Sequence, residues 1–423
     1  MKQRIRVATQ PIQARMTIPG AKSITYRALL MAALSDGVCE LRDILVNEDT
    51  KTLINVLHEL GITMQLDESA KSCIVAGGSG QLPKQEASIW CAENSVILRF
   101  LVAACASSSG TYSLDGAATL RSRSLAPFLD VLGRQGVSIF SSGMEQLPLI
   151  IQGANGLNGG EIKLDASITS QYLSALLMVA PFAKTPMTIE GINLVGRPYV
   201  EMTYAMMADF GVMVRRLHQG RFSIPVPQCY IARDYQVEPD LTIASYFFAA
   251  AAITGGQVTI PSCNIDHSKQ ADAKFVATLK KMGCVMVDNV MELTVKGPVE
   301  LRGVNVDMRD YSDTFMTLAA VAPFANTPTT ITNIGHTRLQ ESNRISAMRA
   351  ELTKLNVKVE EGSDWIKIYP SQPIGTQVDS HQDPRIAMSL SIIGLRTPGV
   401  EIMGAECVAK SCPSFFALWN TLS

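Results

Sequence analysis

Two hydrophobic patterns alternate along the chain, and the first marks where helices end. It reads (Leu or Met)-x-x-(apolar)-(Gly or Asn)-(apolar)-x-(apolar), which is typical of a helix that ends in a left-handed cap and continues as a strand. The caps fall at Gly61, Gly136, Gly211, Gly283 and Asn356, at steps of 72 to 75 residues. Such a regular step indicates an internal repeat, and asparagine is the usual substitute for glycine in this cap.

The second pattern is an alanine-rich helix that is apolar on nearly every side. Glycine or proline ends each of its six copies: RALLMAALSDG, FLVAACASSSG, LSALLMVAPFAKTP, YFFAAAAITGG, TLAAVAPFANTP and IAMSLSIIGLRTPG. Helices of this kind are buried in globular proteins, so we expect these inside and the more charged helices that precede the caps outside. Six β-α-β-type units in 423 residues predict two domains of three units, with a boundary near the proline-containing stretch 225–240.

Polar residues stand just ahead of, or at the start of, each buried helix. They are Lys22, Ser23 and Arg27; Glu93, Asn94, Ser95 and Arg99; Thr169, Ser170 and Gln171; Asp240 and Thr242; Asp310, Ser312 and Asp313; and Asp383 and Arg385. The serine, threonine and aspartate side chains are expected to be N-caps. Cations such as Lys22, Arg99 and Arg385 oppose the helix dipole at these positions, so we predict that they bind phosphate or carboxylate groups there.

Composition narrows the class of protein further. Hydrophobic residues make up 47% of the chain and charged residues 18%, which is typical of a globular protein. A formal net charge of −1 provides no general attraction for nucleic acid or for an anionic membrane surface. The nine scattered cysteines form no C-x-x-C pair and fall at no zinc-ligand spacing, so we expect reduced thiols in a cytoplasmic protein without a metal site.

Targeting segments are not visible in the sequence. The N-terminus MKQRIRVATQ is charged and lacks the apolar core of a signal peptide. The longest apolar helices, such as the one containing SYFFAAAAI, are too short to span a bilayer.

A further polar cluster lies in the segment 337–348. Glu341 and Arg344 are three residues apart, so the spacing predicts that they share one helix face. Taken alone, this spacing favours a surface ion pair that contributes little to stability.

Several segments resemble the 5-enolpyruvylshikimate-3-phosphate synthase family in family order and over almost the whole chain. They are PGAKSITYRALLMAAL, ASITSQYLSALLMVAPFA, GRPYVEMT, VEPDLTIASYFFAAAAI, RDYSDTFMTLAAVAPFA, LQESNRISAM and AKSCPSFF. The resemblance implies a two-domain inside-out α/β barrel built from six βαβαββ repeats. It also implies one domain of residues 1–19 with 236–423, and another of residues 20–235 that carries the acceptor-phosphate site. The transferase that acts on UDP-N-acetylglucosamine is less similar, because it usually has Lys-Asn in place of Lys22-Ser23.

The resemblance implies an activity and its substrates. The family transfers the enolpyruvyl group of phosphoenolpyruvate to the 5-hydroxyl of shikimate 3-phosphate and releases phosphate, without a metal or an organic cofactor. We therefore expect two anionic small-molecule substrates and a cytoplasmic monomer with no nucleic-acid or membrane partner.

Site residues follow from the same resemblance, position by position. Lys22, Asp313 and Glu341 match catalytic residues, with Glu341 in proton transfer and Asp313 at the acceptor hydroxyl. The expected phosphoenolpyruvate-side cations are Lys22, Arg99, Arg123, Arg344, Arg385 and Lys410. The expected acceptor-side residues are Ser23, Arg27, Thr169, Ser170, Gln171, Tyr199 and His336.

The chain departs from the family pattern at several of these positions. Ser95 replaces a glycine against which phosphoenolpyruvate and glyphosate pack, so a side chain intrudes where only backbone fitted. Gln340 replaces a substrate-contacting lysine, Pro384 a histidine, and Gly196 a serine that contacts the acceptor phosphate. His336 and Tyr26 each replace an asparagine.

Three hypotheses follow from these departures. The chain can be a working shikimate enzyme that is insensitive to glyphosate, a relative with altered chemistry or another anionic acceptor, or a non-catalytic binding protein. Retention of Lys22, Asp313 and Glu341 argues against the last, because an unoccupied cluster of buried charges lowers stability.

Overall fold

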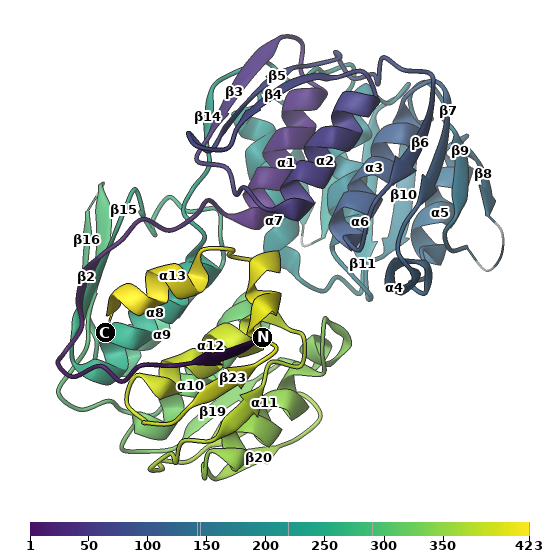
Figure 1. Cartoon of the computed structure of the whole chain (residues 1–423). Coiled ribbons are helices and arrows are strands. Elements are labelled where there is room, and N and C mark those ends of the chain that lie inside the picture. The colour runs from purple at the N-terminus through teal and green to yellow at the C-terminus, as the bar shows by residue number, and fades with distance from the viewer. Residues whose placement is uncertain (142, 144, 219, 290, 423) are drawn as a thin grey trace. The chain divides into compact units, whose positions relative to one another are not determined.

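The computed structural model describes residues 1–141, 143, 145–218, 220–289 and 291–422, and the chain forms two compact units (Figure 1). Unit 1 comprises Met1–Pro19 with Glu238–Ser423, and unit 2 comprises Gly20–Val237. Each unit contains three repeats of one arrangement.

The second repeat of unit 2 shows this arrangement in full. Its elements are β6 (Glu86–Trp90), α3 (Ser95–Ser107), β7 (Thr111–Asp115), α4 (Ala118–Arg121), α5 (Ala126–Arg134), β8 (Ser138–Ser141) and β9 (Leu149–Gln152). Strands β6 and β7 are parallel, β9 is antiparallel to β7, and β8 is antiparallel to β9. Apart from the single-turn α4, this is the predicted βαβαββ order, with a buried helix between the parallel strands and an outer helix after them.

The other two repeats of unit 2 have the same sheet order. One contains α1 (Lys22–Ala33), β3 (Val38–Arg42), α2 (Glu48–Glu59), β4 (Thr63–Asp67), β5 (Ser72–Ala76) and β14 (Tyr235–Gln236), and β14 supplies the parallel partner of β3. The other contains β10 (Gly160–Asp165), α6 (Gln171–Val179), β11 (Met187–Ile192), α7 (Arg197–Asp209), β12 (Arg215–His218) and β13 (Arg221–Ile224).

Unit 1 is built in the same way, and the N-terminal segment completes two of its sheets. The fourth repeat contains β2 (Gln13–Arg15), α8 (Leu241–Thr254), β15 (Gln257–Pro261), α9 (Ala273–Lys281), β16 (Val285–Asn289) and β17 (Glu292–Lys296). The fifth contains β18 (Asn305–Asp307), α10 (Phe315–Val321), β19 (Thr329–Thr332), α11 (Arg344–Lys354), β20 (Val359–Glu361) and β21 (Ile366–Ile368). The sixth contains β22 (Gln377–Asp379), α12 (Pro384–Gly394), β23 (Glu401–Met403), α13 (Phe415–Trp419) and β1 (Lys2–Arg4).

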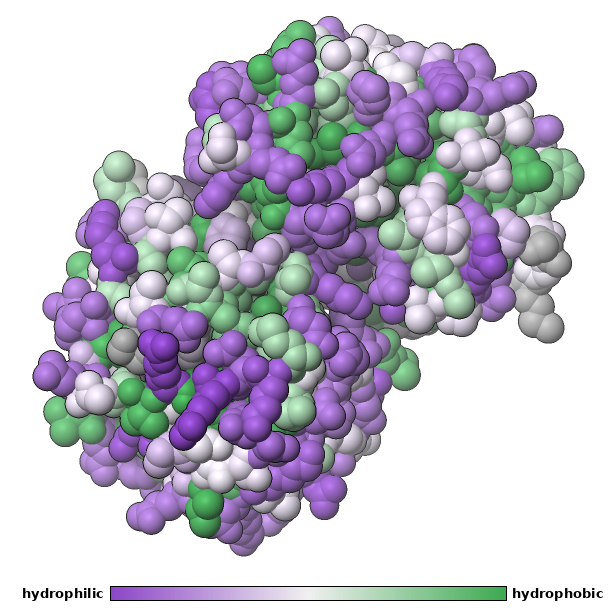
Figure 2. Space-filling view, in the orientation of Figure 1, coloured by the Kyte–Doolittle hydropathy of each residue, from purple (hydrophilic) through white to green (hydrophobic). Residues whose placement is uncertain are grey.

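The alanine-rich helices form the centre of each unit, as their apolar character predicted. Helix α3 packs on α6 in unit 2, and α8 packs on α10 and α12 in unit 1. All described residues of α10 are buried, as are the residues of α8 except Thr254. The sheets lie around these helices (Figure 1), and hydrophilic residues cover much of the face seen in Figure 2. This placement of helices inside and sheets outside is the predicted inside-out architecture.

The five predicted caps are confirmed by backbone geometry. Gly61, Gly136, Gly211 and Gly283 have φ of 95°, 91°, 81° and 109°, and Asn356 has φ of 62°. Each therefore lies in the left-handed region, where glycine is unstrained and asparagine is tolerated. This conformation ends the outer helix and starts the next strand.

Helix starts follow the predicted N-caps in part. Side chains of Asn94, Asp240 and Asp383 accept hydrogen bonds from the first-turn amides of α3, α8 and α12. In contrast, Ala21 and Ser170 precede α1 and α6 without a side-chain cap. No capping bond explains the polar residues at the start of α1, whereas at the start of α6 the Thr169 hydroxyl accepts from the Gln171 amide.

Other expectations concern membranes, thiols and metals. No helix in the described part of the chain is long and apolar enough to cross a membrane. All nine cysteines are free thiols, and burial raises the pKa of Cys91 and Cys263 to about 12. Among the residues that the structure describes, no group of histidine, cysteine or acidic side chains could hold a metal ion.

Two glycines three residues apart test the role of the left-handed caps. Gly136→Ala should lower the free energy of unfolding by about 1 to 2 kcal/mol, because alanine is strained at φ of 91°. Gly133→Ala, inside α5 where an added Cβ meets nothing within 4 Å, should raise it by about 0.5 to 1 kcal/mol. Urea unfolding of both variants measures the contrast, and equal effects would contradict the cap assignment.

Candidate active site

Arg27 is the most deeply buried cation of unit 2. It extends from α1 and is 2% exposed. Its guanidinium donates to Thr203 Oγ1 at 2.7 Å, to the Ser23 carbonyl at 2.9 Å and to the Tyr199 carbonyl at 3.2 Å. Burial lowers its pKa to about 10, and no carboxylate among the described residues forms a salt bridge with it. The charge is thus held by neutral groups alone, which makes an added anion favourable.

Arg99 makes a second such site at the start of α3. It is 6% exposed, donates to Gln171 Oε1 at the start of α6, and lies over the Tyr172 ring at 5.1 Å. Its Nε atom is buried without a hydrogen-bond partner, and burial lowers its pKa. A buried N–H donor without an acceptor is uncommon and points to a missing ligand atom.

Ser95 joins two cations at the N-terminus of α3. Its hydroxyl oxygen accepts from Arg99 Nη1 at 3.4 Å and from the exposed Arg123 Nη1 at 3.2 Å. The serine therefore holds the two guanidinium groups close to the helix end, in addition to adding a side chain there.

Lys22 starts α1 beside a polar network that the sequence did not reveal. Its Nζ lies 3.5 Å from Asp49 Oδ2 and 5.9 Å from the centre of the Tyr26 ring, and its side chain is 31% exposed. Asn94 donates to the same Asp49 oxygen at 2.8 Å. Asp49 therefore ties the start of α1 to the start of α3, and the network leaves Lys22 accessible.

The remaining expected residues of unit 2 lie at the starts of α6 and α7. Thr169 Oγ1 accepts from the Gln171 amide at 3.2 Å, and Ser170 is buried. Gly196 precedes α7 at φ of 59°, and a Cβ added there would lie 3.1 Å from Ser170 Oγ. Glycine at this position therefore suits both the left-handed backbone and the crowding by Ser170.

In unit 1, Arg344 is the centre of a buried ion cluster. It is 2% exposed, and its guanidinium binds Asp383 Oδ2 at 2.8 Å and Asp313 Oδ1 at 3.0 Å. Although burial opposes the charge, Asp383 and Glu341 raise the pKa of Arg344 above its ordinary value. The cation is therefore fixed, and its orientation is set by two carboxylates.

Glu341 completes this cluster in a way that corrects the sequence analysis. Its Oε2 lies 2.7 Å from Arg344 Nη2, so the predicted pair forms. However, Glu341 precedes α11 rather than lying on its face, and Arg344 is buried, so this is not a surface pair. The Glu341 side chain is 56% exposed, which leaves its second oxygen open to a ligand. Gln340 Oε1 also accepts from Arg344.

Asp313 bridges the two arginines expected on the phosphoenolpyruvate side. Its Oδ2 accepts from Arg385 Nη2 at 2.8 Å, while its Oδ1 faces Arg344. Pro384 is the first residue of α12, where a missing N–H leaves no helical bond unmade and φ is already suitable. The Arg385 amide bonds Asp383 at 3.0 Å, which fixes this arginine at the helix start.

His336 and Lys410 lie on short 3-10 turns of unit 1. His336 Nε2 lies 2.8 Å from Ser312 Oγ, and burial lowers the pKa of the imidazole. Lys410 ends the turn Ala405–Lys410 and is exposed. Burial raises the pKa of the nearby Cys407 thiol to about 11, and the charges of Asp383 and Lys410 act on it in opposite directions.

Asp272 is a buried acid near this cluster that the sequence analysis missed. Its Oδ2 accepts from Thr242 Oγ1 at 2.9 Å, whereas its Oδ1 is buried without a partner. Burial, followed by the charge of Asp313, raises its pKa to about 7. No sequence pattern marked this residue, because a single aspartate before a helix is typical of an N-cap. In the structure the Asp272 side chain makes no capping hydrogen bond to α9.

Comparisons with known proteins identify the family. A profile of the EPSP synthase (3-phosphoshikimate 1-carboxyvinyltransferase) family matches residues 7–419. The chain belongs to this family. A 3-phosphoshikimate 1-carboxyvinyltransferase of Trichormus variabilis is 40% identical over 414 residues, which covers 97% of each chain. One from Haemophilus ducreyi is 38% identical over 421 residues, covering 97% of this chain and 96% of the relative.

A solved structure of EPSP synthase from Acinetobacter baumannii has the same fold. It matches with a TM-score of 0.89 at 23% identity and covers 100% of this chain and 98% of its own. The expected two-domain enolpyruvyl transferase fold is therefore confirmed for this EPSP synthase family member.

Within each unit, the structure gathers most of the predicted residues at the starts of the buried helices. Arg99 donates directly to Gln171, and the Ser95 hydroxyl links Arg99 to Arg123. Direct hydrogen bonds join Asp313, Glu341, Arg344 and Arg385. Asp49, Asp383 and Asp272 were not predicted as site residues, although Asp383 was expected as a cap. Asp49 and Asp383 lie far in the sequence from the cations that they contact, so residue spacing could not reveal them.

The raised pKa of Asp272 predicts a pH-dependent stability. Its folded-state pKa of about 7 exceeds the ordinary value, so the folded chain holds a proton that the unfolded chain releases. The contribution of this residue to stability is therefore greatest at low pH and is lost as the pH rises through 7. The neutral variant Asp272→Asn should gain about 2 to 3 kcal/mol relative to the unsubstituted protein between pH 5 and pH 8.

Urea unfolding of both proteins across that pH range measures this difference. A pH-independent effect of the buried amide on the free energy of unfolding cancels, because only the change of the difference with pH is compared. A difference that does not vary with pH would contradict the assignment.

Proposed function

We propose that this chain transfers the enolpyruvyl group of phosphoenolpyruvate to the 5-hydroxyl of shikimate 3-phosphate, with release of phosphate, on the route to chorismate and the aromatic amino acids. Membership of the EPSP synthase family over residues 7–419 carries the proposal. Relatives named for this activity at 38 to 40% identity support it. Both substrates are anions, which suits the buried cations of each unit.

In unit 2, we assign the acceptor to residues around Arg27. Its charge is met only by neutral groups among the described residues, so the phosphate or carboxylate of shikimate 3-phosphate would supply the missing anion. The other acceptor-side residues of this unit are Ser23, Thr169, Ser170, Gln171 and Tyr199. Lys22, Arg99 and Arg123 are assigned to phosphoenolpyruvate, and the unpartnered Nε of Arg99 supports that role.

In unit 1, the proposed chemistry is addition followed by elimination through a tetrahedral intermediate. Asp313 contacts the acceptor hydroxyl, and Glu341 carries the proton exchanged with the methylene carbon. Arg344, Arg385 and Lys410 bind phosphoenolpyruvate, while His336 and Gln340 line the acceptor side. The exposed Glu341 carboxylate and the fixed, buried Arg344 support these assignments, because proton transfer needs access and anion binding needs preorganised charge.

The departures from the family pattern are compatible with this function. Gln340 accepts from Arg344 and so remains in the cluster, although it cannot supply a charge. Pro384 occupies a helix start where its missing N–H is not needed. We propose that Ser95 makes the enzyme insensitive to glyphosate, because its side chain narrows the space next to Arg99.

The proposal requires no metal or organic cofactor and no nucleic-acid or membrane partner. We propose that the protein is a cytoplasmic monomer. The free thiols and a net charge of −1 support this part of the proposal.

Activity is tested with purified protein, shikimate 3-phosphate and phosphoenolpyruvate. Phosphate release together with an enolpyruvyl mass gain in the product is expected, and Glu341→Gln should lower kcat about 10² to 10⁴-fold. Glu300→Gln, an exposed carboxylate of the same unit, serves as the matched control. If no product forms, the Gln340→Lys, Pro384→His variant is measured, and activity gained only there would show that the present site serves other chemistry.

Inhibition by glyphosate distinguishes the effect of the Ser95 Cβ from the effect of the Ser95 hydroxyl. Ser95→Gly should lower the glyphosate inhibition constant about tenfold or more, a change of roughly 1.4 kcal/mol or more in binding. Ser95→Ala keeps the Cβ and loses only the hydroxyl, so it should remain insensitive. If the alanine variant is as sensitive as the glycine variant, the hydrogen bonds to Arg99 and Arg123, rather than the occupied space, cause the insensitivity.

A further inference from the structure

The sheet that contains β1 lacks a strand that the other five sheets possess. Five sheets have four strands each, whereas the sheet of the sixth repeat has three, in the order β22-β23-β1. In the other repeats the fourth strand follows the outer helix and pairs with the strand that β1 replaces here. Among the described residues, no strand pairs with the outer edge of β1. The position of one strand is therefore open.

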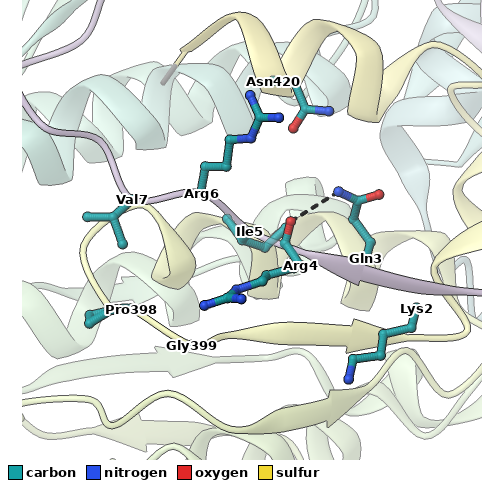
Figure 3. Close-up of a pocket in the computed structure, with 9 residues that line it drawn as sticks. All are labelled: Lys2, Gln3, Arg4, Ile5, Arg6, Val7, Pro398, Gly399 and Asn420. Atoms are coloured by element: carbon teal, nitrogen blue, oxygen red, sulfur yellow. Dashed lines mark hydrogen bonds between the residues drawn. The ribbon is translucent and has the colours of Figure 1, made fainter.

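The open edge presents unpaired backbone groups. Gly404 donates to the Met1 carbonyl and the Ile5 amide donates to Val400, both at 3.0 Å, so the odd-numbered residues of this segment face β23. Because antiparallel strands alternate in this way, the N–H and C=O groups of Lys2 and Arg4 face away from β23. The Arg4 carbonyl accepts only a side-chain bond, from Gln3 Nε2 at 3.1 Å (Figure 3).

A cavity of about 510 Å³ lies along this edge. Its lining runs from Lys2 to Val7, with Pro398 and Gly399 on the β23 side and Asn420 from the C-terminal helical segment (Figure 3). Figure 3 shows Arg6 extending toward Asn420, across the space beside the strand. The cavity thus follows the strand over several residues.

The positive charge along β1 determines which kind of strand can pair with its outer edge. Lys2, Arg4 and Arg6 are exposed cations on alternate residues, and neither arginine forms a salt bridge within the described residues. A second copy of β1 would place like charges opposite one another, which is unfavourable in an antiparallel pair. Lys2 is paired with Glu401 of β23, so an acidic strand would instead have its carboxylates attracted by Arg4 and Arg6.

We propose that the outer edge of β1 binds an extended acidic segment of a partner protein, which adds to this sheet as its fourth strand. Backbone bonds to Lys2 and Arg4 provide the affinity, and the side chains of Arg4 and Arg6 provide the preference for acidic residues. Gln3 releases the Arg4 carbonyl when the segment binds.

The test uses the full chain without an N-terminal tag and a capped hexapeptide of alternating glutamate and valine. We expect a Kd of about 10 to 100 μM, and protection of the Lys2 and Arg4 amides from hydrogen exchange. Arg4→Pro removes the outward N–H without touching the bonds of Met1 and Ile5, and it should weaken binding at least tenfold. Arg6→Glu keeps every backbone group and should also weaken binding.

Matched controls make each outcome decisive. Arg302→Gln, an exposed arginine elsewhere in unit 1, and a hexapeptide of alternating lysine and valine control for general charge attraction. Binding that Arg4→Pro and Arg6→Glu leave unchanged, or binding of the lysine peptide with equal affinity, would overturn the proposal. Absence of acidic-peptide binding at millimolar concentration would do the same. A protein dimer that Arg4→Pro dissociates would assign the edge to a second copy instead.

Discussion

Burial of the six apolar helices is the constraint on which the rest of this structure depends. Because α8 and α10 have almost no polar surface, the sheets must surround them, and only the ends of the central helices remain available for polar chemistry. The proposed substrate-binding cations lie at these ends. Arg27 and Arg99 are held by neutral groups, whereas Arg344 is held by carboxylates. An anion can therefore bind Arg27 or Arg99 in unit 2 without displacing a carboxylate from the arginine.

The carboxylates around Arg344 serve two purposes at once. Asp313 and Asp383 stabilise a cation that would be costly to bury alone, and they fix the directions of its remaining donors. Glu341 contacts the same guanidinium but stays exposed, so a ligand can reach its carboxylate. The cluster thus combines buried acids that fix Arg344 with one exposed acid, Glu341.

Much of the fold could be predicted from the sequence, because the caps and the apolar helices recur with a constant step. Asn356 was recognisable as a cap only because four glycines defined the step before it. The partners of the site residues could not be predicted. Asp49 beside Lys22, and Thr203 beside Arg27, are brought in from distant segments by packing. The buried position of Arg344 reversed the expected surface pair with Glu341, since spacing carries no information on depth.

The fate of the oxygen that bridges carbon and phosphorus in phosphoenolpyruvate tests the central claim most directly. Turnover of substrate labelled with ¹⁸O at that position, in the presence of shikimate 3-phosphate, is followed by mass spectrometry of both products. Enolpyruvyl transfer by addition and elimination predicts that all of the label leaves in the phosphate. Label retained in an organic product would show cleavage between oxygen and phosphorus and would contradict the proposed reaction.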